Sequence, residues 1–286
     1  MDWITRMNAA INYIEEHITD ELDFSKIAQI ACSSAYHFQR IFICMTGMPL
    51  SEYIRRRRMS LAVADLKQNE AKIVDIALKY GYSSPTAFNR AFQSVHGIAP
   101  SLVKKDGATV KSYPPISFKI TVKGAEGMNY RIEKKEAFRI VGFSSPLDQD
   151  FYSDYNQQLV SQMWQLSATN GTTSKLLTLM EGVPSGLLGV MVCDDSLEEW
   201  RYFAAVSSTK EIGNTLEEYI VPPYTWAIFS GEGKDTDAIK ELGTRVITEW
   251  LPTSGYEYDN GPDIEVYLSE EPECVKFEFW MPVKKV

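Results

Sequence analysis

Two arginines, Arg40 and Arg90, stand 50 residues apart in matching surroundings. Each follows an amide, Gln39 or Asn89, and each lies in a Phe-x-Arg-x-Phe pattern that a serine pair precedes and a glycine follows. Arginine reads guanine edges or grips phosphate, and glutamine and asparagine suit adenine. The repeated residue types therefore predict contacts with DNA.

Two short helices joined by a turn must position each copy. The copies are residues 33–47 and 83–97, and each follows a short apolar-periodic segment, 25–31 or 74–80. This order predicts two helix-turn-helix units in one chain, each with its second helix in the major groove. If both recognition helices lie on one side of the duplex, they should be about 34 Å apart.

Each recognition helix is expected to have one apolar and one outward face. The apolar stripes, at i, i+3, i+4 and i+7, are Phe38, Ile41, Phe42 and Met45 in the first copy and Phe88, Ala91, Phe92 and Val95 in the second. The outward residues are Tyr36, Gln39, Arg40 and Ile43, and then Thr86, Asn89, Arg90 and Gln93. A single copy is more often an ordinary amphipathic helix, but two copies with the same stripe and arginine favour DNA reading.

Residues 7–105 resemble the DNA-binding module of AraC-type transcriptional regulators, most specifically over 81–100, GYSSPTAFNRAFQSVHGIAP. The resemblance implies base or phosphate contacts by Tyr36, Gln39 and Arg40 from the first recognition helix and by Pro85, Thr86 and Arg90 from the second. The residue pattern adds Asn89. Cys32 stands where the family usually has a turn glycine, and at positive φ it would cost about 1 kcal/mol relative to glycine.

The charge is divided unevenly along the 286 residues, whose length suggests two domains. Residues 1–107 hold 13 Lys+Arg and 11 Asp+Glu, a net charge of +2. The whole chain has a net charge of −9, so residues 108–286 have a net charge of −11. The basic run 55–58 lies in a long helix expected over 52–67, which must join the two units. Its arginines could grip phosphates, or could pair with acids such as Glu52 and Asp65.

Several classes of site and location are not expected. The four cysteines form no CxxC pair and there are three histidines, so we expect no metal, cofactor or catalytic set. Unpaired cysteines fit a reducing cytoplasm, and the N-terminus does not resemble a signal peptide. No stretch approaches 18 uninterrupted apolar residues, so no membrane partner is expected.

The fold class predicted is multidomain: an all-α module with two helix-turn-helix units over 1–107, a linker over 108–128, and an α+β domain over 129–286. The α+β domain is expected to contain two strand-helix-strand-strand repeats, with helices on one sheet face and the other face open as a groove. The expected strands are 138–143, 186–193, 200–206, 224–230, 263–268 and 276–283, and the expected helices are 150–169 and 235–251.

Three same-face pairs mark a candidate effector site in that groove. Because side chains alternate along a strand, the pairs are Glu265 with Tyr267, Glu278 with Trp280, and Trp200 with Tyr202. A carboxylate among aromatic rings suits a lipophilic cation, at roughly 0.5–2 kcal/mol per ring. The same pattern fits the solvated outer face of an antiparallel sheet equally well.

Residues 129–284 resemble the GyrI-like effector-binding domains, most strongly over 261–267 and 277–283. The resemblance implies a groove glutamate that meets cationic drugs, either Glu265 or Glu278. An AraC-type module followed by such a domain resembles the Rob-type arrangement. We therefore expect a cytoplasmic transcription regulator, more an activator than a repressor, that binds duplex DNA, a small effector and RNA polymerase. The alternatives are a small-molecule hydrolase, in which a groove glutamate polarises water, and a ligand-free protein-docking domain.

Overall fold

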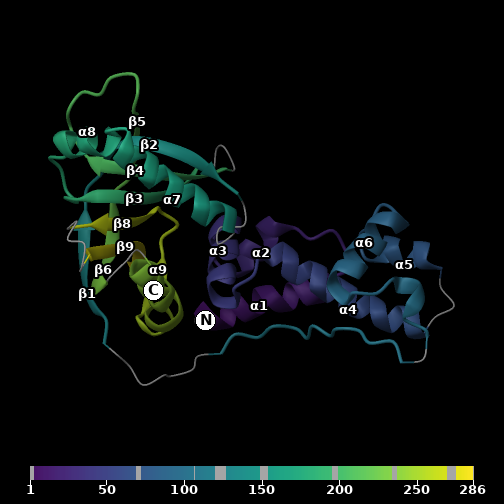
Figure 1. Ribbon diagram of the computed structural model, residues 1–286. Helices are drawn as coiled ribbons and strands as arrows, with labels where there is room; N and C mark the ends of the chain where they lie inside the picture. Colours follow the sequence, from purple (N-terminus) through teal and green to yellow (C-terminus); the bar gives the residue numbers. More distant parts are fainter. Residues whose placement is uncertain are drawn as a thin grey trace. The chain divides into compact units, whose positions relative to one another are not determined.

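The computed structural model describes the chain except for short gaps, and it divides into two compact units, residues 1–119 and 120–286 (Figure 1). The described residues are 3–68, 72–105, 107–119, 127–148, 154–194, 199–233, 237–268 and 275–285, without the side chains of Tyr36, Asp154, Cys193, Asp194 and Glu199. Among them, no helix has the length and apolar character needed to cross a bilayer.

The first unit is all-helical and contains both expected helix-turn-helix pairs. Its helices are α1 (Trp3–Glu16), α2 (Phe24–Ile30), α3 (Ala35–Thr46), α4 (Leu50–Gln68), α5 (Ile73–Lys79), α6 (Pro85–His96) and the 3-10 turn η1 (Pro100–Leu102). Helices α3 and α6 begin alike, because Ser34 and Ser84 accept hydrogen bonds from the first-turn amides of each helix. They also end alike, at Gly47 and Gly97, both left-handed.

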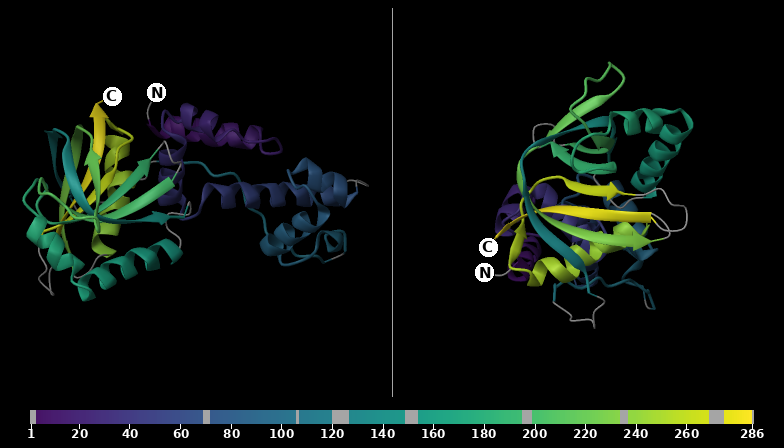
Figure 2. Two further views of the ribbon diagram at one scale, coloured as in Figure 1. Left: turned by 90° about the horizontal axis from the view of Figure 1, so that it is seen from above. Right: turned by 90° about the vertical axis from the view of Figure 1, so that its left-hand side faces the viewer.

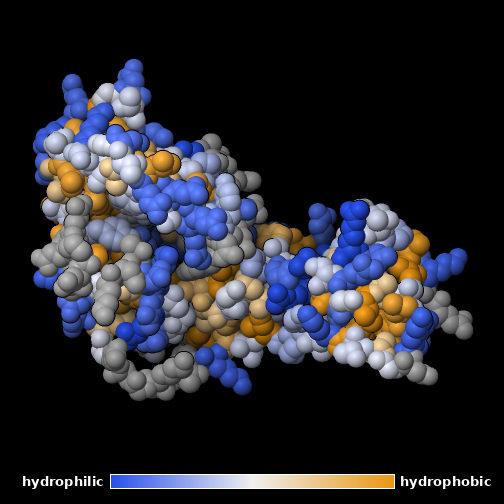
Figure 3. All heavy atoms as spheres, viewed as in Figure 1, coloured by the Kyte–Doolittle hydropathy of each residue, from blue (hydrophilic) through white to orange (hydrophobic). Residues whose placement is uncertain are grey.

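Two small cores lie along α4. Phe38 and Phe42 of α3 are almost fully buried, as are Phe88 and Phe92 of α6, so the predicted apolar stripes are confirmed at these positions. The second core also includes Met59, Ala62 and Leu66 of α4, whose N-terminal half carries the buried Leu50, Tyr53 and Ile54 instead. Helix α4 therefore contributes buried side chains to the cores of both helix-turn-helix units. In the space-filling view, apolar side chains reach the surface over the second of them (Figure 3).

The second unit is an antiparallel sheet with helices, so the α+β class is confirmed. In sheet order the strands are β1 (Asn129–Lys135), β6 (Tyr224–Gly233), β9 (Val275–Lys285), β8 (Asp263–Tyr267), β3 (Leu187–Asp194), β4 (Glu199–Ser207), β2 (Phe138–Leu147) and β5 (Glu217–Val221), while β7 (Tyr256–Tyr258) pairs with β9. The helices are α7 (Asp154–Thr169), α8 (Thr172–Leu179) and α9 (Asp237–Arg245), which continues into the π turn η2 (Val246–Trp250) and the 3-10 turn η3 (Leu251–Thr253).

Strands β1, β5 and β7 and helix α8 were not predicted from the sequence. The sequence did predict six strands, which are β2, β3, β4, β6, β8 and β9. Helices α7 and α9 lie within the two predicted helical ranges. The duplication of a strand-helix-strand-strand unit stays a prediction.

The helices cover one face of the sheet, as expected. Leu176 of α8 packs on the paired residues Val141 and Val206, and α9 packs on β6 and β9. Residues that pair across strands share a face of the sheet. Val206 shares its face with Ala204, and successive pairings lead from Ala204 through Gly189 and Glu265 to Phe279, which contacts Gly243 of α9. Helices α8 and α9 therefore lie on the same side.

The opposite face is a core, so the prediction that it would be an open groove is wrong. Buried residues from many strands pack there: Ile140, Leu188, Val190, Val192, Phe203, Ala205, Val221, Trp226, Ile228, Ile264, Val266 and Trp280. The rings of Phe138 on β2 and Trp226 on β6 lie 6.5 Å apart, although β9, β8, β3 and β4 separate these strands in the sheet. The sheet therefore curves far enough to pack that face against itself (Figure 2).

Candidate DNA-binding and ligand-binding sites

Helix α6 presents the second set of predicted DNA-contacting residues to solvent. Pro85, Thr86, Asn89 and Arg90 are all exposed, and Gln93 extends the same face. The buried stripe on the opposite side fixes this orientation, because Phe88 and Phe92 must face α4 and α5. An exposed helix face with arginine, asparagine and threonine can donate to phosphates and to base edges.

Helix α3 differs from its repeat. Gln39 is partly exposed, whereas Arg40 retains 6% and Ile43 3% of their exposure. The side chain of Tyr36 lies outside the described residues.

The four arginines of α4 make contacts within the first unit. Arg55 and Arg56 pair with Glu52, as one of the two interpretations of the sequence proposed. Arg57 pairs with Glu15 of α1, and Arg58 donates to the carbonyls of the α1–α2 loop. Arg57 and Arg58 therefore hold α4 against α1 and the α1–α2 loop, whereas Arg55 and Arg56 form ion pairs within α4.

In the second unit, Glu265 lies beside two tyrosines on the helix-covered face. The hydroxyl of Tyr267 donates to its carboxylate at 2.9 Å, and the hydroxyl of Tyr202 on β4 lies beside the same carboxylate over Gly189. Burial raises the pKa of both phenols, and the charge of Glu265 raises it further, so both stay protonated donors. Gly189 makes this possible, because a Cβ there would lie 2.2 Å from the Tyr202 hydroxyl.

Trp164 of α7 completes this cluster, which we call the Glu265 site. Its indole N–H donates to the Tyr202 hydroxyl at 3.0 Å, and its ring meets Tyr267 edge-on at 6.1 Å between centroids. Glu265 and Tyr267 are partly exposed, whereas Tyr202 is buried. A partly exposed carboxylate is thus held in place by the Tyr267 hydroxyl and bordered by aromatic rings.

Glu278 and Trp280 do not join the Glu265 site, which corrects the prediction of one shared groove. In the ladder Glu278 opposes Val266 and Glu265 opposes Phe279, so the two glutamates lie on opposite faces. Glu278 receives two hydrogen bonds from Arg131 of β1 and one from the indole of Trp280. Trp280 belongs to the sheet core.

The third predicted pair falls on the side of the Glu265 site. Tyr202 belongs to the site, and Trp200 shares its face by alternation along β4. Trp200 is buried, with 6% of its surface exposed.

Both units match known families. Residues 128–284 match the GyrI-like small-molecule-binding domain, and residues 27–106 match a helix-turn-helix domain. The chain belongs to the AraC-type regulators that carry a GyrI-like domain.

The regulator is similar to HTH-type activators over its first unit and to Rob over nearly its whole length. It is 41% identical to the transcriptional activator AarP of Providencia stuartii over 92 residues, 32% of this chain and 68% of AarP. It is 38% identical to the regulatory protein SoxS of Salmonella typhimurium over 91 residues, 32% of this chain and 85% of SoxS. The transcriptional regulator Rob of Salmonella typhimurium is 26% identical over 288 residues, 96% of each chain.

Sequence reasoning missed two residues of this regulator's Glu265 site. Trp164 lies on a helix far from the strands in sequence, and a tryptophan on an amphipathic helix usually indicates core packing. Gly189 interrupts an apolar strand, which is a known signal for close approach of another group. That signal could have been used.

Proposed function

We propose that the regulator reads two adjacent major-groove segments of duplex DNA. The second segment is contacted by Pro85, Thr86, Asn89 and Arg90 of α6, and the first by Tyr36, Gln39 and Arg40 of α3. The supporting observation is the exposed polar face of α6 opposite its buried stripe. Selection from random duplexes should recover two conserved half-sites about one helical turn apart. Recovery of a single conserved half-site would contradict two-segment reading.

We propose that the effector is a lipophilic cation and that Glu265, with Tyr267, Tyr202 and Trp164, receives it. The carrying observation is the partly exposed carboxylate that the neutral Tyr267 hydroxyl holds beside Tyr202, because this hydrogen bond orients the charge without cancelling it. Glu278 already meets the cationic side chain of Arg131, which makes it the poorer receptor. Trp200 lies on the same face as Glu265 and supports the site from β4.

The effector proposal is tested by calorimetric titration of lipophilic cations and of uncharged analogues of the same shape. Glu265→Gln should weaken cation binding about tenfold, equivalent to about 1.4 kcal/mol, and leave the uncharged analogues unaffected. Glu278→Gln is the matched control and should change cation affinity less than twofold. A larger loss in Glu278→Gln than in Glu265→Gln would transfer the site to the other face of the sheet.

We propose binding rather than catalysis at this site. Both tyrosine hydroxyls have raised pKa values, so they serve as donors and not as bases. A bound cation should be recovered chemically unchanged after prolonged incubation with the protein, as followed by mass spectrometry. Turnover that Glu265→Gln abolishes would establish a hydrolase instead.

We further propose that the regulator is a cytoplasmic activator that contacts RNA polymerase. Effector binding would shift the protein between conformations, and the shift is limited by the ligand's differential affinity for them. Transcription from a bound promoter, measured in vitro with purified polymerase, should rise with protein and rise further with a bound cation. Equal output with and without every cation that binds would contradict regulation by the effector.

A further inference from the structure

Residues 110–118, here called the strap, run without regular secondary structure alongside α4 and contact both helix-turn-helix units. At one end, Val110 and Tyr113 pack against the core of the second helix-turn-helix unit. At the other end, the ring of Phe118 lies edge-on to Phe42 of α3, with 6.2 Å between centroids. The strap therefore connects the two helix-turn-helix units a second time, in addition to α4.

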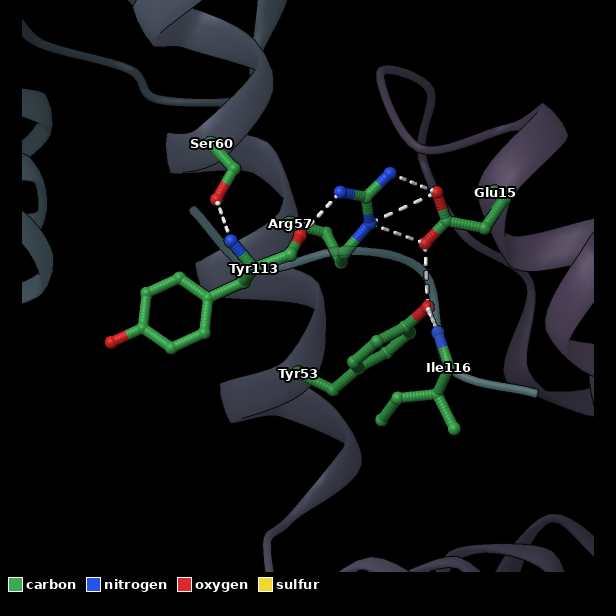
Figure 4. A network of polar contacts seen from close by, with 6 residues as sticks. All are labelled: Glu15, Tyr53, Arg57, Ser60, Tyr113 and Ile116. Atoms are coloured by element: carbon green, nitrogen blue, oxygen red, sulfur yellow. Dashed lines mark hydrogen bonds and ion pairs between the residues drawn. The ribbon is translucent and has the colours of Figure 1, made fainter. Parts of the chain in front are cut away.

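Side chains of α4 hold the middle of the strap (Figure 4). The Tyr113 amide donates to the Ser60 hydroxyl at 3.0 Å, and the Tyr113 carbonyl accepts from Arg57 at 2.5 Å. The Ile116 amide donates to the Tyr53 hydroxyl at 3.2 Å. The guanidinium of Arg56 also lies over the Tyr113 ring, 5.2 Å from its centroid.

The end of the strap is held by one side chain of α1. Asn8 accepts from the Phe118 amide at 2.8 Å and donates to the Phe118 carbonyl at 2.9 Å. Phe118 is buried, although the chain around it is exposed. An ordinary linker leaves such backbone groups to water, whereas here side chains of the helical unit satisfy them. Pro114 and Pro115 stiffen the segment between the two attachment points.

We propose that the strap is a positioning element for DNA reading, which fixes the separation of the two recognition helices. Helices α3 and α6 both pack on α4, and one helix as sole connection can bend. A second connection across both units restricts that bending, so the regulator should discriminate the spacing between two half-sites. This inference depends on the proposed two-segment DNA binding. The strap lies beyond residues 27–106, which match the helix-turn-helix family.

The test uses the full-length chain and three duplexes built from the selected two-half-site sequence. One duplex keeps the selected spacing, one has a base pair inserted between the half-sites, and one has a single half-site scrambled. The double variant Asn8→Ala/Ser60→Ala removes strap contacts and no DNA-facing residue. Asn12→Ala, an exposed asparagine on the same helix, is the matched control. Hydrogen exchange at the Tyr113 and Phe118 amides reports whether the strap has loosened.

In the double variant the two amides should exchange faster, and the preference for the selected spacing over the inserted one should fall about fivefold. The affinity of the double variant for the duplex with one intact half-site should stay within twofold of wild type, since each helix-turn-helix unit remains folded. Asn12→Ala should match wild type throughout. An unchanged spacing preference with a loosened strap would overturn the proposal, and so would an unloosened strap, because these contacts would then not hold it. If wild type itself fails to select two half-sites, the proposed DNA function fails instead.

Discussion

Helices α3 and α6 have the same local sequence signals and the same helix geometry, yet they differ in what they expose. Both begin at a serine cap, bury a phenylalanine pair and end at a left-handed glycine. Arg90 is exposed on α6, whereas Arg40, at the equivalent place on α3, retains 6% of its exposure. A repeated sequence thus encodes a local structure twice, while the exposure of the matching arginine differs between the two copies.

The two halves of the first unit also differ in how their charges are held, and this difference carries the largest expected effect. Arg57 and Glu15 retain 8% and 18% side-chain exposure, against 51% and 19% for Lys79 and Asp65 in the second half. Burial raises the pKa of Glu15, but hydrogen bonds from Arg57 and Tyr53 outweigh burial and lower it below its ordinary value, so the carboxylate is charged at neutral pH.

Arg57→Met should lower the free energy of unfolding of the first unit by about 3 kcal/mol, because it leaves a half-buried carboxylate without its cation. Lys79→Met is the matched change, in which an exposed cation with one hydrogen bond to Asp65 is removed while the Tyr80 hydroxyl still donates to Asp65, and it should cost less than about 1 kcal/mol. Urea titrations followed by hydrogen exchange of α1 and α4 amides would measure both. Equal losses would show that burial does not distinguish the two pairs.

The next largest expected effect is a difference in DNA affinity between arginine substitutions in the two recognition helices. Arg90→Ala should weaken binding to the selected duplex by about 1–3 kcal/mol, or roughly five- to 150-fold, whereas Arg40→Ala should weaken it less. Fluorescence anisotropy at fixed salt would measure both. Equal losses would show that Arg40 moves outward when DNA binds.

Arg90→Lys adds a distinction between two kinds of contact. Lysine retains a phosphate contact but cannot replace a bidentate contact to guanine. Recovery of wild-type affinity in Arg90→Lys would therefore assign Arg90 to the backbone.

The features that sequence predicted well are those set by neighbouring residues. The apolar stripes of α3 and α6 each lie within about two helical turns, so periodicity was sufficient to predict them. Alternation likewise placed Glu265 with Tyr267 on one face, and the hydrogen bond between their side chains agrees with it.

The features that sequence missed are set by contacts across the chain. Alternation within β9 could not show that Glu278 lies on the face opposite Glu265, because that depends on the register between β8 and β9. The polar, proline-containing strap was predicted to belong to a linker, since its composition excludes regular secondary structure. That composition does not exclude attachment, which Asn8 provides from more than 100 residues away.

The turns between the paired helices offer the smallest and most closely matched test. Cys32 and Gly81 occupy equivalent places with φ of 53° and 82°, and each is followed by a residue whose amide donates back to the first helix at 2.9 Å. Left-handed backbone costs a residue with a Cβ about 1 kcal/mol relative to glycine. Cys32→Gly should therefore raise the free energy of unfolding of the first unit by up to about 1 kcal/mol.

Gly81→Ala is the converse change and should cost at least about 1 kcal/mol, because its left-handed conformation is strained for alanine. The new Cβ would also lie 2.9 Å from a guanidinium nitrogen of Arg58, whose side chain is held by the carbonyls of Ile18 and Asp20. Thermal unfolding of the two variants should thus shift in opposite directions. A loss of stability in Cys32→Gly would mean that contacts of the Cys32 side chain outweigh the backbone strain, and the two turns would then differ in energy as the two recognition helices differ in exposure.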